Sequence, residues 1–239
     1  MSKRVKILSA VLIAAAGLLT VFWQIFFAKS TSYYIISVVI LVLSAIPFLA
    51  GFEQSKPSAR EMALIAVLIS LAVASRAVFY LIPQFKPIGA VVIAAAVCLG
   101  ADRGYIIGAF SAFVSNFIFG QGIWTPFQMV ALGLVGFLSG LIFDKIKASK
   151  VNLSVIGFVL TAVLYGLIVD LSSVLTITND YSFASVAAVY IAGLPFSLIF
   201  GGTTAIFLYL FGEPFIKKIK RIILKYDINN KLESDDIYG

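Results

Sequence analysis

Long apolar runs recur along the chain, and short segments that contain glycine, proline or charged residues separate them. An α-helix needs about 20 apolar residues to cross the hydrocarbon core of a bilayer, so most of these runs are long enough to span a membrane. The runs 88–100 and 105–119 are short, which predicts either a thinned bilayer at this place or a helix pair shielded inside the bundle. The pattern predicts eight helices, at residues 5–28, 33–52, 62–82, 88–100, 105–119, 127–143, 151–175 and 185–211.

The composition also indicates a membrane protein. Hydrophobic residues make up 61% of it and charged residues 12%, whereas soluble domains contain about 25% charged residues. The expected fold is an all-α membrane protein, a compact bundle of about eight transmembrane helices. Lys3, Arg4 and Lys6 precede the first run, as basic residues do in a signal peptide. This run is longer than the roughly 7 to 15 residues of a signal-peptide core, so we expect it to remain as a helix.

Basic residues orient the predicted helices. With the N-terminus inside, nearly all lysines and arginines fall in inside segments, and the outside loops hold only Lys29 and Lys86. Cytoplasmic segments of membrane proteins carry such an excess, so both termini are predicted to be cytoplasmic. The net charge of +7 then reflects topology and calls for no nucleic-acid partner. The basic, amphipathic tail at 215–226 is expected to lie along the inner membrane surface.

Several kinds of chemistry have no residues to support them. The chain contains no histidine and a single cysteine, Cys98, which we interpret as a small buried hydrophobe. A zinc or haem centre and a histidine-activated nucleophile are therefore not expected. The sequence also lacks a glycine-rich loop that ends in Gly-Lys-Ser or Gly-Lys-Thr, so we expect no ATP hydrolysis by this chain. No metal and no permanently bound cofactor is predicted.

The candidate binding site is a group of polar and aromatic residues in the outer half of the predicted bundle. Segment 116–129, NFIFGQGIWTPFQM, is uncharged and rich in amides and aromatic rings, and its part 120–125 is predicted to form an external lid. Polar residues inside spans usually face a cavity or a partner, so helices that bring them together would form a capture site. The predicted substrate-binding residues are Arg76, Tyr80, Lys86, Asn116, Gln121, Trp124, Gln128, Asp170 and Tyr190.

A structural interpretation stands beside each of these assignments. Arg76 and Asp170 can form an ion pair that joins two helices, because opposite charges in a low-dielectric bundle strongly prefer partners. Asn116 and Gln128 can be interhelical hydrogen bonds, and the aromatic residues can belong to the membrane-interface belt. Lys86 can extend to water along the interface instead of attracting an anionic ligand group.

Small residues mark a second candidate surface. Ala59, Ala63 and Ala66 lie near the inner end of the span 62–82 and offer a smooth strip, either for packing inside the bundle or for contact with a partner helix. The glycines of segment 133–140 are interpreted as the place where two helices of the bundle cross closely.

The stretch 60–140 carries a resemblance to a known family. It contains ALIAVLISLAVASRAVF and then PQFKPIGAVVIAAAVCLGADRGYIIGAFSAFVSNFIFGQGIWTPFQM. This stretch resembles the substrate-binding S component of energy-coupling factor (ECF) vitamin transporters, and most of all the cobalamin-type branch. The similarity covers about 58–211, which implies a six-helix S-component core. Segment 1–57 would then be a two-helix N-terminal extension, and 212–239 a cytoplasmic amphipathic basic tail.

The resemblance implies a mechanism. S components bind a vitamin from outside and dock through small residues of their first core helix on a membrane scaffold, the T component, which carries two cytosolic ATPases. Here Ala59, Ala63 and Ala66 would form the docking strip, although Val67 interrupts the regular spacing of four. The cargo would be cobalamin or a related corrinoid. The chain would be no enzyme but a multi-pass subunit in the bacterial cytoplasmic membrane, in contact with the lipid bilayer.

Other functions remain open at this point. The chain can be an S component for another vitamin, such as riboflavin or a queuosine precursor. It can also be a self-sufficient secondary transporter in which Arg76 and Asp170 relay a proton or bind a coupling ion, although no inverted repeat is evident. A membrane enzyme with Asp170 as its base is the weakest alternative, because no second acid, histidine or metal cluster accompanies it.

Overall fold

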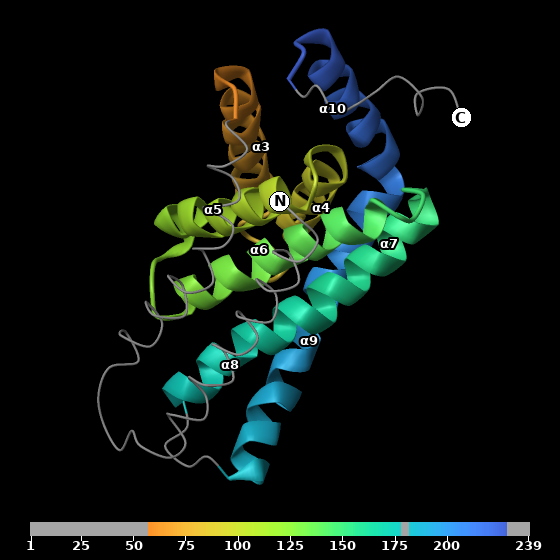
Figure 1. Ribbon diagram of the computed structural model, residues 1–239. Coiled ribbons are helices and arrows are strands. Elements are labelled where there is room, and N and C mark those ends of the chain that lie inside the picture. The colour runs from red at the N-terminus through yellow and green to blue at the C-terminus, as the bar shows by residue number, and fades with distance from the viewer. Residues whose placement is uncertain (1–56, 178–181, 229–239) are drawn as a thin grey trace, which may run out of the picture.

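A computed structural model describes residues 57–177 and 182–228, and these residues form helices joined by short loops (Figure 1). Within this part of the chain there are six continuous helices where the core was predicted to have six. Both N-terminal spans, 5–28 and 33–52, lie outside the described residues. The helices are α3 (Ala59–Val78), α4 (Ile88–Leu99), α5 (Ala101–Phe119), α6 (Trp124–Phe143), α7 (Lys150–Val159) with the π-helical η1 (Leu160–Tyr165) and α8 (Gly166–Ile177), and α9 (Phe183–Phe207) with the π-helical η2 (Leu208–Gly212) and α10 (Glu213–Lys225).

Four of these helices are long and apolar enough to cross a membrane: Ala59–Val78, Trp124–Phe143, Lys150–Thr176 and Phe183–Lys225. The prediction of a short helix at 105–119 is wrong at its N-terminal end, because α5 begins at Ala101 and has 19 residues. Asp102 and Arg103, which precede the predicted run, lie within the first turn of the helix. Arg103 is held there by a salt bridge to Glu61.

Helix α4 is the short helix that the bundle shields. It has 12 residues, and all of them except Val91 and Val97 are buried. A helix of this length is too short to cross a bilayer by itself. The neighbouring helices cover it, as the prediction of a shielded short helix requires. Gly100 alone separates α4 from α5, with a φ of 87° that favours glycine strongly over other residues.

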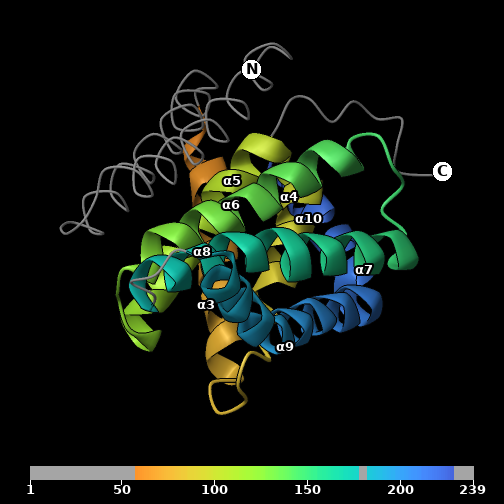
Figure 2. The same ribbon diagram turned by 90° about the horizontal axis from the view of Figure 1, so that it is seen from below.

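The helices α5 and α6 pack with their backbones in contact. A Cβ atom added to Gly108 would clash with the carbonyl group of Leu132, and one added to Gly136 would clash with the carbonyl group of Gly104. Only glycine permits this approach, so the predicted helix crossing in segment 133–140 is confirmed. Figure 2 shows α6, the α7–α8 helix and α9 in succession across the bundle.

The basic tail packs on the bundle. Helix α10 continues α9 through η2, and its residues Ile216, Ile219 and Ile223 are buried in the same apolar core as α4. The thiol of Cys98 on α4 faces the carbonyl oxygen of Ile216 at 3.7 Å, which confirms that this cysteine is a buried small hydrophobe. The protein itself therefore covers much of the apolar side of this helix, and the position of the tail along the inner membrane surface stays a prediction.

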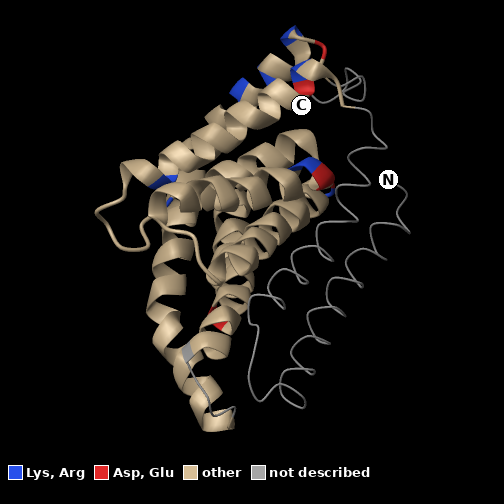
Figure 3. Ribbon diagram, turned by 90° about the vertical axis from the view of Figure 1, so that its left-hand side faces the viewer, with Lys and Arg blue, Asp and Glu red and all other residues tan. Residues whose placement is uncertain are grey.

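Hydrogen bonds and a salt bridge join the helix ends that were predicted to lie inside. Arg103 Nε lies 2.8 Å from Glu61 Oε1, and Arg60 Nη1 donates to the carbonyl oxygen of Tyr226 at 2.9 Å. Figure 3 shows most of the charged positions gathered toward one end of the described bundle. We call it the inner end and the opposite end the outer end.

Candidate functional site

Arg76 anchors a polar network at the outer end. It lies in the last turn of α3 and donates hydrogen bonds from Nη1 to Ser115 Oγ and, at 3.0 Å, to Asn116 Oδ1 on α5. Its guanidinium carbon lies 4.1 Å from the ring centroid of Phe119, one turn further along α5. The ends of α3 and α5 therefore present one oriented cation.

Asn116 holds this cation in place. Its side chain is almost fully buried, and its Nδ2 donates to Gln128 Oε1 at 2.9 Å and to Thr125 Oγ1 at 3.1 Å on α6. The interpretation of Asn116 and Gln128 as an interhelical hydrogen bond is confirmed. Because Asn116 uses both donors and its carbonyl oxygen within the protein, it acts here as a positioning residue.

The loop between α5 and α6 closes on itself. The Thr125 hydroxyl donates to Gln121 Oε1 at 3.0 Å and accepts from the backbone N–H of Gly122 at 3.1 Å. Gln121 Nε2 donates to the carbonyl oxygen of Phe113 at 3.1 Å. No residue of 120–125 lines either of the outer cavities described below, and the role of this loop as a lid stays a prediction. The loop braces Asn116 through Thr125.

The loop between α3 and α4 supplies the second cation. Lys86 Nζ lies 5.4 Å from the centroid of the same Phe119 ring that Arg76 covers. Burial, and then the positive charge of Arg76, lower the pKa of Lys86 to about 8. Gln84, two residues earlier, has a φ of 56°, a left-handed conformation that is uncommon for residues other than glycine.

Two cavities adjoin at this end of the bundle. The small cavity, of about 50 Å³, is lined by Arg76 and Lys86 among others. The large cavity, of about 520 Å³, is lined by Asp170 among others. The linings of both include Gln84, Gln128, Tyr165 and Phe200, which come from the α3–α4 loop, α6, η1 and α9.

Asp170 lines only the large cavity, and Arg76 lines only the small one. The Asp170 carboxylate rests against the backbone of α9 at Gly193, where an added Cβ would clash with it. No salt bridge joins Asp170 to Arg76 or to another described basic residue, so the expected ion pair is not formed. The two opposite charges face adjoining cavities instead.

The three predicted aromatic residues lie around the cavities without lining them. The Tyr80 ring packs 5.2 Å from Phe119 and is 59% exposed, and the exposed Trp124 ring covers Gly122. The Tyr190 hydroxyl donates to the carbonyl oxygen of Leu167 at 3.1 Å. Their positions agree better with belt and packing roles than with ligand contact.

Sequence reasoning missed several residues that build the site. The Ser115 hydroxyl accepts a hydrogen bond from Arg76, and the Thr125 hydroxyl accepts one from Asn116. The Phe119 ring contacts both cations. Gln84 and Tyr165 line both cavities. A signal existed for Tyr165, which ends an apolar run just before Gly166, but the π-helical turn that it closes is visible only in the structure.

The candidate docking strip lies at the inner end of α3. Ala59, Ala63 and Ala66 are exposed, as are Met62 and Val67 beside them, at 51% and 61%. The strip is therefore available for contact with a partner, and packing inside the described bundle does not use it.

Comparison with known proteins places the chain in a family. Residues 56–222 match a family of unknown function, DUF6580. The chain belongs to this family. No curated protein and no solved structure matches it. The DUF6580 match begins just before α3 and ends within α10, so it covers all six described helices.

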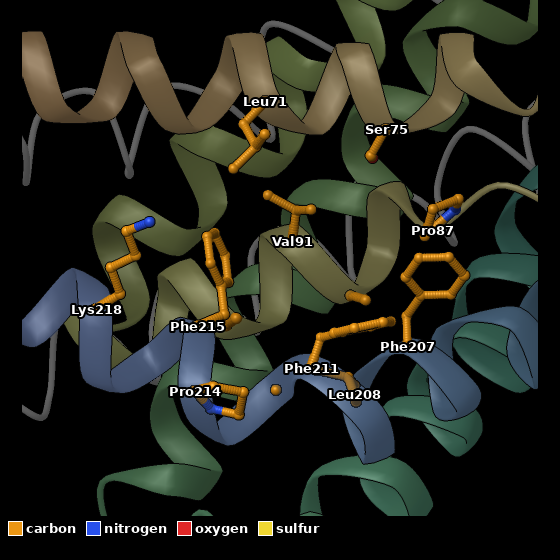
Figure 4. A pocket seen from close by; sticks show the side chains of 13 residues that line it. Leu71, Ser75, Pro87, Val91, Phe207, Leu208, Phe211, Pro214, Phe215 and Lys218 are labelled. Carbon is orange, nitrogen blue, oxygen red and sulfur yellow. The ribbon is translucent and has the colours of Figure 1, made fainter.

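This DUF6580 member also has an apolar groove on its flank (Figure 4). The groove has a volume of about 400 Å³ and lies between α3, α4 and the α9–α10 helix. Leu71, Val91, Phe211 and Phe215 line it, and Lys218 stands at one end. It shares no lining residue with the two outer cavities.

Proposed function

We propose that the chain is a substrate-capture subunit of the S-component type, which binds a small molecule from outside and passes it to an ECF importer. The observation that carries the proposal is the large cavity of about 520 Å³ at the outer end, beside unpaired charges. Pockets of about 300 to 1,000 Å³, mostly apolar with a few oriented polar groups, are typical of small-molecule sites.

The lining of the cavities supports capture by a rigid bundle. Residues from the α3–α4 loop, α6, η1, α8 and α9 converge there, so a ligand would contact helices that are far apart in sequence. The Arg76–Asn116–Gln128 hydrogen bonds hold the polar side chains before a ligand arrives. Such preorganisation favours affinity, because less side-chain ordering remains to be done on binding.

The size of the cavity bears on the cargo. A corrinoid such as cobalamin, which the resemblance suggests, is much larger than the drug-sized ligands that fill a cavity of this volume. We therefore propose a smaller cargo, in the size range of riboflavin or a queuosine precursor. Titration of the purified chain with cobalamin, cobinamide, riboflavin and queuine tests whether molecules of the smaller size bind more tightly than the corrinoids.

Delivery is proposed to use the strip Ala59, Ala63 and Ala66. Small exposed side chains let two helices approach closely in a membrane, where packing drives association. The strip lies at the inner end, near the side on which cytosolic ATPases would act. We propose a location in the bacterial cytoplasmic membrane, with a scaffold T component and two ATPases as partners.

The test is uptake by proteoliposomes that contain the chain with or without ECF scaffold and ATPase subunits from the same organism. We expect ATP-dependent uptake only with the partners. Ala63→Trp should abolish uptake and leave ligand binding unchanged. Val163→Trp is the matched control, because Val163 is also exposed, at 51%, on another helix.

One observation favours a second candidate, the secondary transporter. Arg76 and Asp170 form no salt bridge among the described residues and lie at adjoining cavities, as a coupling site would require. Uptake driven by a proton gradient in liposomes that contain this chain alone would establish the second candidate and overturn the first.

A further inference from the structure

We infer that the substrate carries an anionic group, a carboxylate or a phosphate, that binds between Arg76 and Lys86. We further infer that a basic or hydrogen-bond-donating group of the same molecule faces Asp170. The inference deepens the proposed capture function and rests on it for its biological meaning. Its chemistry is tested separately.

Two cations without an acidic partner make the first subsite. Arg76 and Lys86 approach one Phe119 ring at 4.1 and 5.4 Å, and neither forms a salt bridge with a described acidic residue. The Arg76 Nε atom is buried and has no hydrogen-bond partner among the described residues. A partly buried pair of like charges is unfavourable by itself, and a bound anion would remove both the repulsion and the unsatisfied donor.

The remaining groups of the small cavity are also suited to an anion. Gln128 lines the cavity and its Oε1 accepts from Asn116, so its amide N–H groups, which have no partner among the described residues, can donate to a ligand. Guanidinium, ammonium and amide donors together match the several lone pairs of a carboxylate or phosphate. A volume of about 50 Å³ suits one functional group, so the rest of the molecule must extend elsewhere.

The large cavity is the place into which the molecule extends. It adjoins the small one and contains the Asp170 carboxylate, the Ser173 and Ser197 hydroxyls and the Phe196 ring. Asp170 faces this space without a cationic partner among the described residues. An amine or N–H group would satisfy it, and an apolar or aromatic body would fill the space between the two subsites.

The experiment measures binding of simple probes to the purified full chain in detergent by calorimetry. Hexanoate carries only the anion, hexylamine only the cation and hexanol neither, while 4-aminobutyrate, 6-aminohexanoate and 8-aminooctanoate carry both at three spacings. We expect saturable binding of hexanoate and none of hexanol. We also expect one amino acid of the series to bind at least about threefold more tightly than hexanoate.

Substitutions test which residues bind the anionic end and the cationic end of the probe. Arg76→Gln and Lys86→Gln should each weaken hexanoate binding about tenfold, and Lys145→Gln, an exposed inner-end control, should leave it unchanged. Asp170→Asn should remove the gain of the amino acid over hexanoate and leave hexanoate binding itself intact. If Arg76→Gln does not fold, the loop variant Lys86→Gln and the conservative Arg76→Lys carry the test.

Each outcome decides between the claims. Equal binding of hexanoate and hexanol, or hexanoate binding that survives both Arg76→Gln and Lys86→Gln, would overturn the anion subsite. A gain that persists in Asp170→Asn, or the absence of any gain, would overturn the second subsite. ATP-coupled uptake of a neutral solute that Arg76→Gln does not affect would contradict the inference and leave the capture function standing. Binding of the probes as expected, without ATP-coupled uptake, would support the two subsites and contradict the proposed capture function.

Discussion

The two ends of the described bundle handle charge in opposite ways. At the inner end, the buried Glu61 carboxylate lies 2.8 Å from Arg103 Nε, so these two opposite charges form a salt bridge within the protein. At the outer end, Arg76 and Lys86 share one aromatic ring and Asp170 stands apart, without a salt bridge to either. A paired charge holds helices together, whereas an unpaired one near a cavity is available to a ligand. Under the proposed function, the inner pair therefore stabilises the fold and the outer charges bind the ligand.

The largest effect is expected from breaking the inner pair. Arg103→Gln leaves Glu61 buried without its cation and should lower the free energy of unfolding by about 3 kcal/mol. Ligand affinity of the folded fraction should not change, because the pair lies at the opposite end. Denaturation in mixed detergent measures the loss, and Arg103→Gln combined with Glu61→Gln should recover part of it. An unchanged free energy would remove the structural role of the inner pair.

The next effect concerns the position of Asp170. Gly193→Ala places a methyl group where the Asp170 carboxylate lies, so the carboxylate must move and the amino acid that binds best should bind about threefold more weakly. Gly202→Ala on the same helix is the matched control, because nothing lies within 4 Å of its added Cβ. Calorimetry of both variants checks the prediction. Equal losses in the two would indicate a general effect on α9.

The pH dependence of binding sharpens the role of Lys86. Its pKa is lowered to about 8, so the side chain is charged below that pH and becomes neutral above it. The Arg76 guanidinium lies against the same Phe119 ring. Hexanoate, which remains ionised, should therefore bind about threefold more weakly as the pH rises from 7 to 9. Lys86→Arg should flatten this profile, and an identical decline in that variant would point to another group.

A small effect on stability is expected at Arg76, in contrast to Arg103. Arg76→Gln removes a cation that pairs with no acidic residue in the described part of the chain, so only its hydrogen bonds to Ser115 and Asn116 are lost, and the free energy of unfolding should fall by about 1 kcal/mol. The same denaturation assay gives the comparison. A loss as large as that of Arg103→Gln would mean that Arg76 serves mainly to hold α3 and α5 together.

The smallest effect is expected at Trp124. Its ring is 43% exposed and lies outside both cavities, so Trp124→Ala should change hexanoate affinity by less than about twofold. Asn116→Ala is the informative comparator, because it removes the hydrogen bonds that orient Arg76 and Gln128 and should weaken binding severalfold. Comparable effects of the two variants would indicate that the α5–α6 loop contributes to ligand binding.

The chemistry of the site was more predictable than its geometry. Arg76, Lys86, Gln128 and Asp170 could be singled out, because polar residues are rare in apolar spans and each lies in the outer half. The lining loop could not be identified, because the α3–α4 loop and the α5–α6 loop each contain a glutamine and have a proline in them or close by. The structure places Gln84, from the α3–α4 loop, at the cavities.

The sequence by itself determined the number, order and approximate bounds of the six described helices, because an apolar run of sufficient length is a local property. It also predicted that the helix containing segment 133–140 crosses another helix closely, and the structure identified that partner as α5. Only the tertiary structure decided that Arg76 bonds to Ser115 and Asn116 and not to Asp170. The rotation of each helix about its axis selects such partners, and that rotation depends on packing between segments far apart in the chain.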